Sequence, residues 1–200
     1  MKLVLASNNA GKLRELQTML APLGVELMAQ SSLGVPEAAE PHCTFLENAL
    51  AKARHASEHT GLPALADDAG LCVEAFGGLP GVDTAYYATQ FGLPKGDANN
   101  IQVLLRELQG QADRRAALVS TIVAVRHAKD PQPLVASGRV AGLVMETPTG
   151  DGGFGFDPVL WIPEADKTLA QMTADEKNAI SHRGQASRQM MALIQQQWLA

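Results

Sequence analysis

Short apolar runs alternate with stretches of helical periodicity along most of this 200-residue chain. Leucines at positions 13, 16, 20 and 23 recur at helical spacing, so they predict a helix over 13–23. Thr44-Phe45-Leu46-Glu47 matches a capping box, so a second helix is expected to begin at Thr44. It is expected to run to about His59, because Gly61 would stop it. Two more helices are expected over 99–108 and 181–198, a loop over 30–42, a turn over 77–81, and strands over 2–6, 25–29, 117–127, 134–145 and 159–162. The alternation predicts a single α/β domain over residues 1–200, built on a mixed sheet.

The most informative polar feature is the pair Asp67-Asp68, which follows the apolar run 62–66 and precedes Ala69-Gly70 and a second apolar run, 71–73. Burying two adjacent carboxylates beside apolar strands is costly, so a metal ion, a cation or a proton must compensate them. At the end of a strand such a pair could hold Mg²⁺ through oxygen ligands and activate a water. Asp-Asp-Ala-Gly is also good turn chemistry, and the pair taken alone favours a turn.

Composition excludes several classes of protein. Hydrophobic residues make up 46% of the chain and charged residues 18%, which is typical of a globular protein with a core. The net charge of -5 argues against binding to a nucleic acid polymer, although a local basic cluster could still meet a small anionic substrate. The longest strongly apolar stretch, 116–125, is too short and too polar at Ser120 and Thr121 to span a membrane.

The two cysteines and the N-terminus bear on location. Cys43 and Cys72 lack C-x-x-C spacing, and two free thiols are typical of a reducing compartment. The apolar run 3–6 is too short for the core of a signal peptide. We therefore expect a cytoplasmic protein.

Two basic features could meet an anion. In the turn Ser7-Asn8-Asn9-Ala10-Gly11-Lys12, small residues precede a helix whose N-terminus favours negative charge, and Lys12 adds a full positive charge. The turn lacks the spacing of a P-loop and could simply cap the helix. The helix that begins at Thr44 carries a stripe of polar residues at helical spacing: Asn48, Lys52, His55 and His59. This stripe is expected to be a solvated face, although Lys52 could contact phosphate.

Two motifs near the C-terminus could recognise a base. Gly152-Gly153-Phe154-Gly155-Phe156-Asp157-Pro158 alternates glycines with aromatic residues, so an exposed Phe could stack on a base. The alternative is a loop with one Phe in the core. In Lys177–Gly184, Ser181 could cap the last helix and leave His182 and Arg183 in its first turn, where the helix dipole disfavours cations and a ligand could compensate.

Six motifs occur together in order: S-N-N-A-G-K, T-F-x-E-N-A-x-x-K-A, A-D-D-A-G-L, G-G-x-P-G-V, G-G-F-G-F-D-P and E-K-N-A-I-S-H-R-G. The chain resembles the non-canonical purine nucleoside triphosphate pyrophosphatases over nearly its whole length. The resemblance implies an elongated α/β fold of two lobes on a long twisted mixed sheet flanked by helices, a homodimer, and a nucleotide cleft between the lobes. It also implies Mg²⁺-dependent hydrolysis of ITP, dITP, XTP and dXTP to a monophosphate and pyrophosphate.

The resemblance assigns a role to each motif. The triphosphate would be held by Ser7, Asn8, Asn9, Ala10, Gly11 and Lys12, with Lys52 and Ala69 close by. Glu40 and Asp68 would bind Mg²⁺, and Asp68, with Asp67 beside it, would activate the water. The base pocket would consist of Phe154, Gly155, Phe156, Asp157, Lys177, His182 and Arg183.

The sequence departs from the family pattern at two positions. Ala69 replaces a serine, which removes a hydroxyl contact to substrate, and Tyr86 replaces an arginine near the cleft or the dimer edge. Two other interpretations remain open: a pyrophosphatase of related fold for other nucleotides, and a nucleotide sensor without catalysis. The carboxylates Glu40, Asp67 and Asp68 argue against the sensor, because binding a polyanion gains little from three acids.

Overall fold

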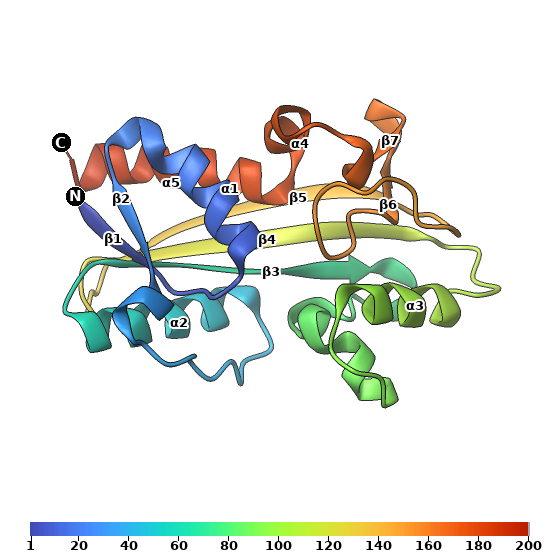
Figure 1. Cartoon of the computed structure of the whole chain (residues 1–200), viewed down its shortest axis with the longest axis horizontal. Helices are drawn as coiled ribbons and strands as arrows, with labels where there is room; N and C mark the ends of the chain where they lie inside the picture. Colours follow the sequence, from blue (N-terminus) through green and yellow to red (C-terminus); the bar gives the residue numbers. More distant parts are fainter. Residues whose placement is uncertain (200) are drawn as a thin grey trace. The chain divides into compact units, whose positions relative to one another are not determined.

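The computed structural model describes residues 1–199 and contains a seven-stranded sheet in the order β2-β1-β3-β4-β5-β6-β7 (Figure 1). The strands are β1 (Lys2–Leu5), β2 (Glu26–Ala29), β3 (Ala64–Val73), β4 (Arg115–Val125), β5 (Leu134–Val144), β6 (Leu160–Ile162) and β7 (Lys167–Thr168). β1 pairs in parallel with β2 and β3, whereas β6 pairs in antiparallel fashion with β5 and β7. The expectation of an α/β fold with a mixed sheet is therefore confirmed.

The α-helices are α1 (Ala10–Leu20), α2 (Phe45–Thr60), α3 (Asp97–Glu107), α4 (Ala174–Ile180) and α5 (His182–Gln197). Short 3-10 segments cover η1 (Ala21–Leu23), η2 (Gln30–Leu33), η3 (Glu74–Phe76), η4 (Gly81–Phe91), η5 (Pro163–Ala165) and η6 (Leu169–Gln171). Within residues 1–199, every helix is too short or too polar to cross a membrane.

The chain divides into two compact units. Unit 1 comprises Met1–Asp68, Ser120–Gly138 and Arg183–Ala200, and unit 2 comprises Ala69–Val119 and Arg139–His182. The single domain expected over 1–200 stays a prediction, and the two units are described separately below.

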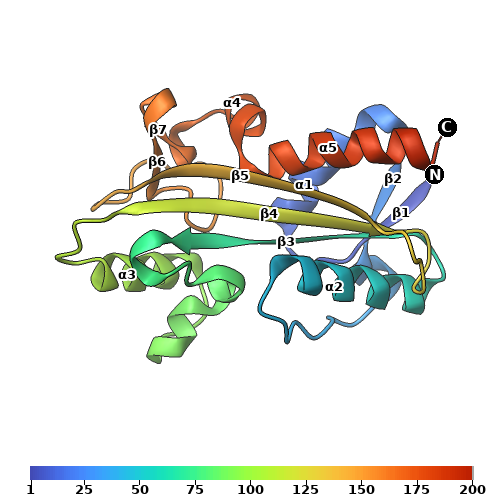
Figure 2. The same cartoon turned by 180° about the vertical axis from the view of Figure 1, so that it is seen from behind.

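Unit 1 covers both faces of its strands with helices (Figures 1 and 2). Leu3 and Leu5 of β1 join an apolar cluster with residues of α1 and α5, while Val4 joins a cluster with Ala49 and Ala53 of α2. Successive side chains of a strand point to opposite faces, so the apolar residues 3–5 of β1 are buried on both. Thr44 caps α2 through a bond accepted from the Glu47 N–H, and Gly61 ends it in a left-handed conformation, as the sequence predicts.

Unit 2 has one apolar cluster of its own. α3 contributes Ile101, Val103 and Leu104, which pack in the same cluster as Phe156 and Leu169. α4 begins at a capping box formed by Thr173 and Glu176, a signal that the sequence analysis overlooked in placing only one helix near the C-terminus.

The structure excludes the turn that the pair Asp67-Asp68, taken alone, favours. β3 runs without a break from Ala64 to Val73, so the pair lies inside a strand and is buried. A carboxylate can occupy a buried strand only where partners compensate its charge. Those partners come from segments distant in the sequence.

Candidate active site

The central carboxylate of unit 1 is Asp67, and three other elements bind it. The Lys12 ammonium of α1 lies 3.1 Å from Asp67 Oδ2, and the Arg183 Nε of α5 donates to the same oxygen at 3.0 Å. Ser120 of β4 donates a hydrogen bond from its hydroxyl to Asp67 Oδ1. Arg183 also donates to Glu15 Oε2 at 2.6 Å. We call this set of residues, with Asp68, Lys52 and Glu40, the acidic centre.

These partners keep Asp67 ionised. Burial alone would raise the pKa of this carboxyl, but Arg183 and Lys12, with the bond from Ser120, hold that pKa far below its usual range. Burial also lowers the pKa of Lys12 below its ordinary value, with the Asp67 charge opposing the shift. Both carboxylate oxygens of Asp67 are therefore occupied by two cations and a hydroxyl. This arrangement suits Asp67 to positioning Lys12 and Arg183 rather than to accepting a proton.

Asp68 stands in a different environment although it is the next residue of β3. Lys52 of α2 donates to Asp68 Oδ1 at 2.7 Å and to Glu40 Oε2 at 2.8 Å, so one ammonium bridges two carboxylates. Burial raises the pKa of Asp68 above its ordinary value despite the attraction of Lys52. Burial works to lower the pKa of Lys52, but Asp68 and Glu40 outweigh it and raise that pKa. A carboxylate with a raised pKa is the better proton acceptor of the pair.

The donor set of the acidic centre fits Mg²⁺. Asp68 Oδ2 is buried and makes no hydrogen bond in the structure, whereas Oδ1 is taken by Lys52. The exposed side chain of Glu40, which also pairs with Lys52, adds a second carboxylate to the acidic centre. Residues 1–199 hold no cluster of three or more His, Cys, Asp or Glu side chains arranged for a metal. One or two carboxylates completed by substrate phosphates are nevertheless a usual arrangement for Mg²⁺.

The turn before α1 is organised by its own side chains. Asn9 caps the helix by accepting a bond from the Lys12 N–H at 3.0 Å, and Ser7 Oγ accepts from the Asn9 N–H at 3.1 Å. Asn8 donates to Glu37 and accepts from the buried Gln30. The cap occupies the Lys12 N–H, so the N–H groups of Ala10 and Gly11, which lack carbonyl partners within the helix, are the ones that can meet an anion.

Unit 2 carries a second group of predicted residues in the segment 152–157, which we call the base loop. Lys177 of α4 donates to Asp157 Oδ2 at 2.7 Å, and the same oxygen accepts from the Phe154 N–H at 2.8 Å. The Lys177 ammonium also lies 4.9 Å from the centre of the Phe154 ring. A half-buried aromatic face, a carboxylate and an ammonium therefore occur together at this loop.

The structure defines the surroundings of three predicted residues more closely than the sequence does. Phe156 packs in the apolar core with only 2% of its surface exposed, which is the alternative of one Phe in the core, whereas Phe154 is half-buried. Arg183 donates to Asp67 and Glu15 in unit 1, contacts that the sequence did not predict, and its expected role in the base pocket stays a prediction. Asn48 is buried and bonds the His42 backbone through its amide, so its stripe on α2 is not a uniformly solvated face.

Two further predicted residues, Ala69 and His182, belong to unit 2. Ala69 follows Asp68 on β3 and is partly buried, and His182 begins α5 and is buried. Ser120 and Glu15 are partners of Asp67 and Arg183 that the motifs did not predict. Ser120 carried a signal, since a hydroxyl inside an apolar strand needs a partner, and Glu15 is one helical turn from Lys12.

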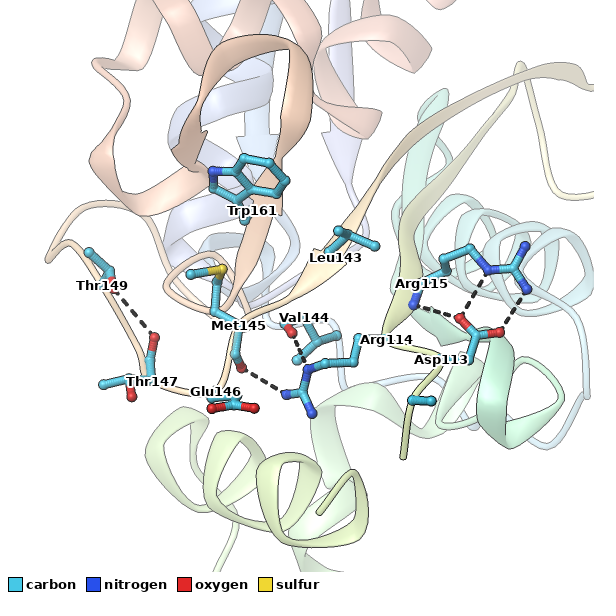
Figure 3. A pocket seen from close by; sticks show the side chains of 11 residues that line it. Asp113, Arg114, Arg115, Leu143, Val144, Met145, Glu146, Thr147, Thr149 and Trp161 are labelled. Carbon is cyan, nitrogen blue, oxygen red and sulfur yellow. Dashed lines mark hydrogen bonds and ion pairs between the residues drawn. The ribbon is translucent and has the colours of Figure 1, made fainter. Parts of the chain in front are cut away.

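A cavity of about 860 Å³ in unit 2 is lined by none of the predicted site residues (Figure 3). Arg114 lines this cavity, and its guanidinium donates to the backbone carbonyls of Val144 and Met145 (Figure 3). Arg115 is paired with Asp113. These arginines are occupied by the protein itself, so the cavity lacks the features of a phosphate site.

Comparison with known proteins identifies the family. The Ham1 family model matches residues 3–193. A dITP/XTP pyrophosphatase from Acidovorax sp. (strain JS42) is 67% identical over 200 residues, covering all of this chain and 98% of the relative. Another from Paracidovorax citrulli (strain AAC00-1) is 66% identical over 198 residues, covering 99% of this chain and 100% of the relative.

Solved structures agree with this assignment. A HAM1 protein from Coxiella burnetii superposes with a TM-score of 0.90 at 41% identity, covering 98% of this chain and 99% of that one. A nucleoside-triphosphatase / dITP/XTP pyrophosphatase from Mycobacterium abscessus gives a TM-score of 0.74 at 39% identity, covering 97% and 99% of the two chains. Because the family model and these relatives match almost every residue, the chain belongs to the Ham1 family.

Proposed function

We propose that this protein is an enzyme that hydrolyses ITP, dITP, XTP and dXTP to the nucleoside monophosphate and pyrophosphate. Relatives at 66–67% identity carry the name dITP/XTP pyrophosphatase. The observation that carries the proposal is the contrast between Asp67, held ionised by Lys12 and Arg183, and Asp68, whose pKa is raised and whose Oδ2 makes no hydrogen bond.

The chain's own residues supply most of the chemistry. Lys12 and the N–H groups at the start of α1 attract the triphosphate, and Lys52 adds positive charge that offsets the departing pyrophosphate. Asp68 accepts the proton of the attacking water, because both carboxylate oxygens of Asp67 are already occupied by Lys12, Arg183 and Ser120. Water attacks the α-phosphorus, and the bond to the pyrophosphate oxygen breaks.

Mg²⁺ is part of this proposal, with Glu40 and Asp68 as its protein ligands. When bound, the ion supplies positive charge that polarises phosphate oxygens. Glu40→Gln should raise the Mg²⁺ concentration needed for half-maximal activity, whereas Glu58→Gln, an exposed control on α2, should not. An unchanged Mg²⁺ requirement in Glu40→Gln would remove that residue from the ligand set.

Base selection rests on the pairing of an acceptor and a donor at the base loop. Hypoxanthine and xanthine present O6, an acceptor, beside N1–H, a donor, which complements Lys177 and Asp157. Adenine reverses both groups, and a mismatch that leaves buried polar groups unpaired is worth roughly 10²-fold or more. Guanine shares O6 and N1–H, so its rejection requires contacts near C2.

A panel of nucleoside triphosphates tests the proposal. The protein is incubated with ITP, XTP, GTP and ATP plus Mg²⁺, and products are resolved by anion exchange. We expect kcat/KM for ITP and XTP to exceed that for ATP by about 10²-fold, with pyrophosphate as the co-product. Asp157→Ala should narrow this gap. Equal kcat/KM values for ITP and ATP would overturn the assignment of the base loop. Absence of turnover with every substrate would overturn the proposal that the protein hydrolyses these nucleotides.

Two further expectations belong to the proposal. A homodimer predicts a mass of twice the 21.2 kDa chain in size-exclusion chromatography with light scattering. A cytoplasmic location predicts recovery in the soluble fraction of cells after separation from membranes and periplasm. Monomeric mass or recovery outside that fraction would contradict them.

A further inference from the structure

Asp97 connects helix α3 to the base loop, although 58 residues separate the bonded pair in sequence. Its Oδ2 accepts a hydrogen bond of 2.7 Å from the Gly155 N–H. None of the six sequence motifs includes Asp97. Both residues lie in unit 2.

The bond acts on a single peptide group. The peptide that joins Phe154 to Gly155 donates from its N–H to Asp97, and its carbonyl accepts from the Asp157 N–H at 3.4 Å. Gly153 and Gly155 on either side of Phe154 adopt left-handed φ values of 72° and 64°, which only glycine adopts readily. The peptide plane directly after the Phe154 Cα is therefore held on both sides in a backbone that would otherwise have unusual freedom.

The other end of the bond is firmly anchored. Ile101, Val103 and Leu104 of α3 are buried in the cluster that also contains Phe156 of the base loop. The start of α3 is held separately, since Asn99 donates to the Pro94 carbonyl at 2.8 Å. The carboxylate of Asp97 is thus directed to the loop, and a charged acceptor makes the stronger kind of hydrogen bond.

We propose that Asp97 is a positioning residue for base recognition: by fixing the Phe154–Gly155 peptide, it sets the orientation of the Phe154 ring and of the Asp157–Lys177 pair toward a purine base. This inference rests on the function proposed above. It assigns base affinity to a residue outside the six family motifs, and it predicts no effect on groups that bind phosphate.

Binding measurements with two probes separate these effects. IMP carries the base, whereas inorganic tripolyphosphate carries phosphates alone, and isothermal titration gives a Kd for each. Asp97→Ala should weaken IMP about 5- to 10-fold, the loss expected for one hydrogen bond to a charged acceptor, and change the tripolyphosphate Kd less than about 2-fold. Asp97→Asn keeps an oxygen acceptor and should hold IMP within about 3-fold of the wild type.

Asn99→Ala is the matched control, because it removes a hydrogen bond at the same helix start without touching the base loop. It should leave the IMP Kd unchanged even if it lowers the melting temperature. Asp97→Ser gives a second test if Asp97→Ala folds poorly, since serine favours a helix start while its shorter side chain stops before Gly155. It should weaken IMP as Asp97→Ala does.

Equal weakening of IMP and tripolyphosphate, or an Asp97→Ala protein that binds IMP normally, would overturn the proposal. So would Asn99→Ala matching Asp97→Ala in its effect on IMP. Wild-type turnover of ITP is measured in parallel. A wild-type protein that converts ITP to IMP while Asp97 proves indifferent refutes this inference alone, whereas failure to bind IMP or turn over ITP refutes the proposed function and this inference with it.

Discussion

The acidic centre of unit 1 and the base loop of unit 2 hold their charged groups by different means. Asp67 collects its partners from α1, β4 and α5, so side chains far apart in sequence are brought together by a buried network of charges. In the base loop, Asp157 bonds the Phe154 backbone three residues away, and left-handed glycines shape the turn. The acidic centre therefore depends mainly on long-range ion pairs, whereas the base loop combines local backbone geometry with single bonds from Lys177 and Asp97.

The acidic centre repeats this contrast at the scale of two neighbouring residues. Asp67 and Asp68 are adjacent on β3, so they point to opposite faces of the strand. Asp67 meets two cations and a hydroxyl, and Asp68 meets one lysine that it shares with Glu40. The proposed function therefore gives Asp67 a structural role and Asp68 a chemical one, and substitutions can separate the two.

The largest effect is expected from Asp67→Asn. Removing this charge leaves the buried Lys12 and Arg183 facing an amide, and loss of one partner from a buried ion network costs about 3–5 kcal/mol of unfolding free energy. Urea unfolding measures this cost. Asp113→Asn, which breaks an exposed pair with Arg115, is the matched control and should change stability little. Equal stability of the two variants would show that the network does not hold unit 1.

Asp68→Asn should affect catalysis more than stability. The amide keeps the shape but cannot accept a proton, so kcat for ITP should fall at least ~10²-fold, the lower end for loss of a general base. Steady-state kinetics at saturating Mg²⁺ measure it, with circular dichroism as the control for folding. Near-normal turnover would mean that the proton acceptor lies elsewhere.

Gly153→Ala and Gly155→Ala test the local geometry of the base loop. Both residues have positive φ, so both variants bear similar backbone strain, of order 1 kcal/mol. A methyl group at Gly153 would meet the Asp157 carboxylate, whereas one at Gly155 meets nothing within 4 Å. We expect kcat/KM for ITP to fall roughly tenfold more in Gly153→Ala, because Asp157 must move. Equal losses in the two variants would show that strain alone, and not Asp157, decides the effect.

The smallest effect concerns an ion pair of unit 1 outside the acidic centre. Burial alone would raise the pKa of Asp130, but hydrogen bonds from Arg126 lower that pKa to about 2. A lowered folded-state pKa adds stability above the unfolded value of 3.8, and that stability is lost as pH falls through about 2. Wild type should therefore lose more stability than Asp130→Asn between pH 4 and pH 2 in urea titrations. Parallel losses in both proteins would contradict the assignment.

The local signals in the sequence were sufficient for elements such as α2, whose cap at Thr44 and stop at Gly61 lie where the pattern predicts them. They failed at Asp67-Asp68, because Asp-Asp-Ala-Gly has turn chemistry and the compensating charges are remote. Burial of Phe156 and the place of Arg183 likewise depend on tertiary contacts that no single-chain periodicity encodes. The motif order could indicate which residues matter, but not which carboxylate each cation meets.

The most direct test of the central claim is hydrolysis of ITP in ¹⁸O-labelled water, followed by mass spectrometry of both products. Attack on the α-phosphorus places the label in IMP and leaves pyrophosphate unlabelled, which is the result expected if the start of α1, Lys52 and Asp68 act as proposed. Labelled pyrophosphate, or labelled orthophosphate as the first product, would show attack at another phosphorus and contradict the proposed reaction.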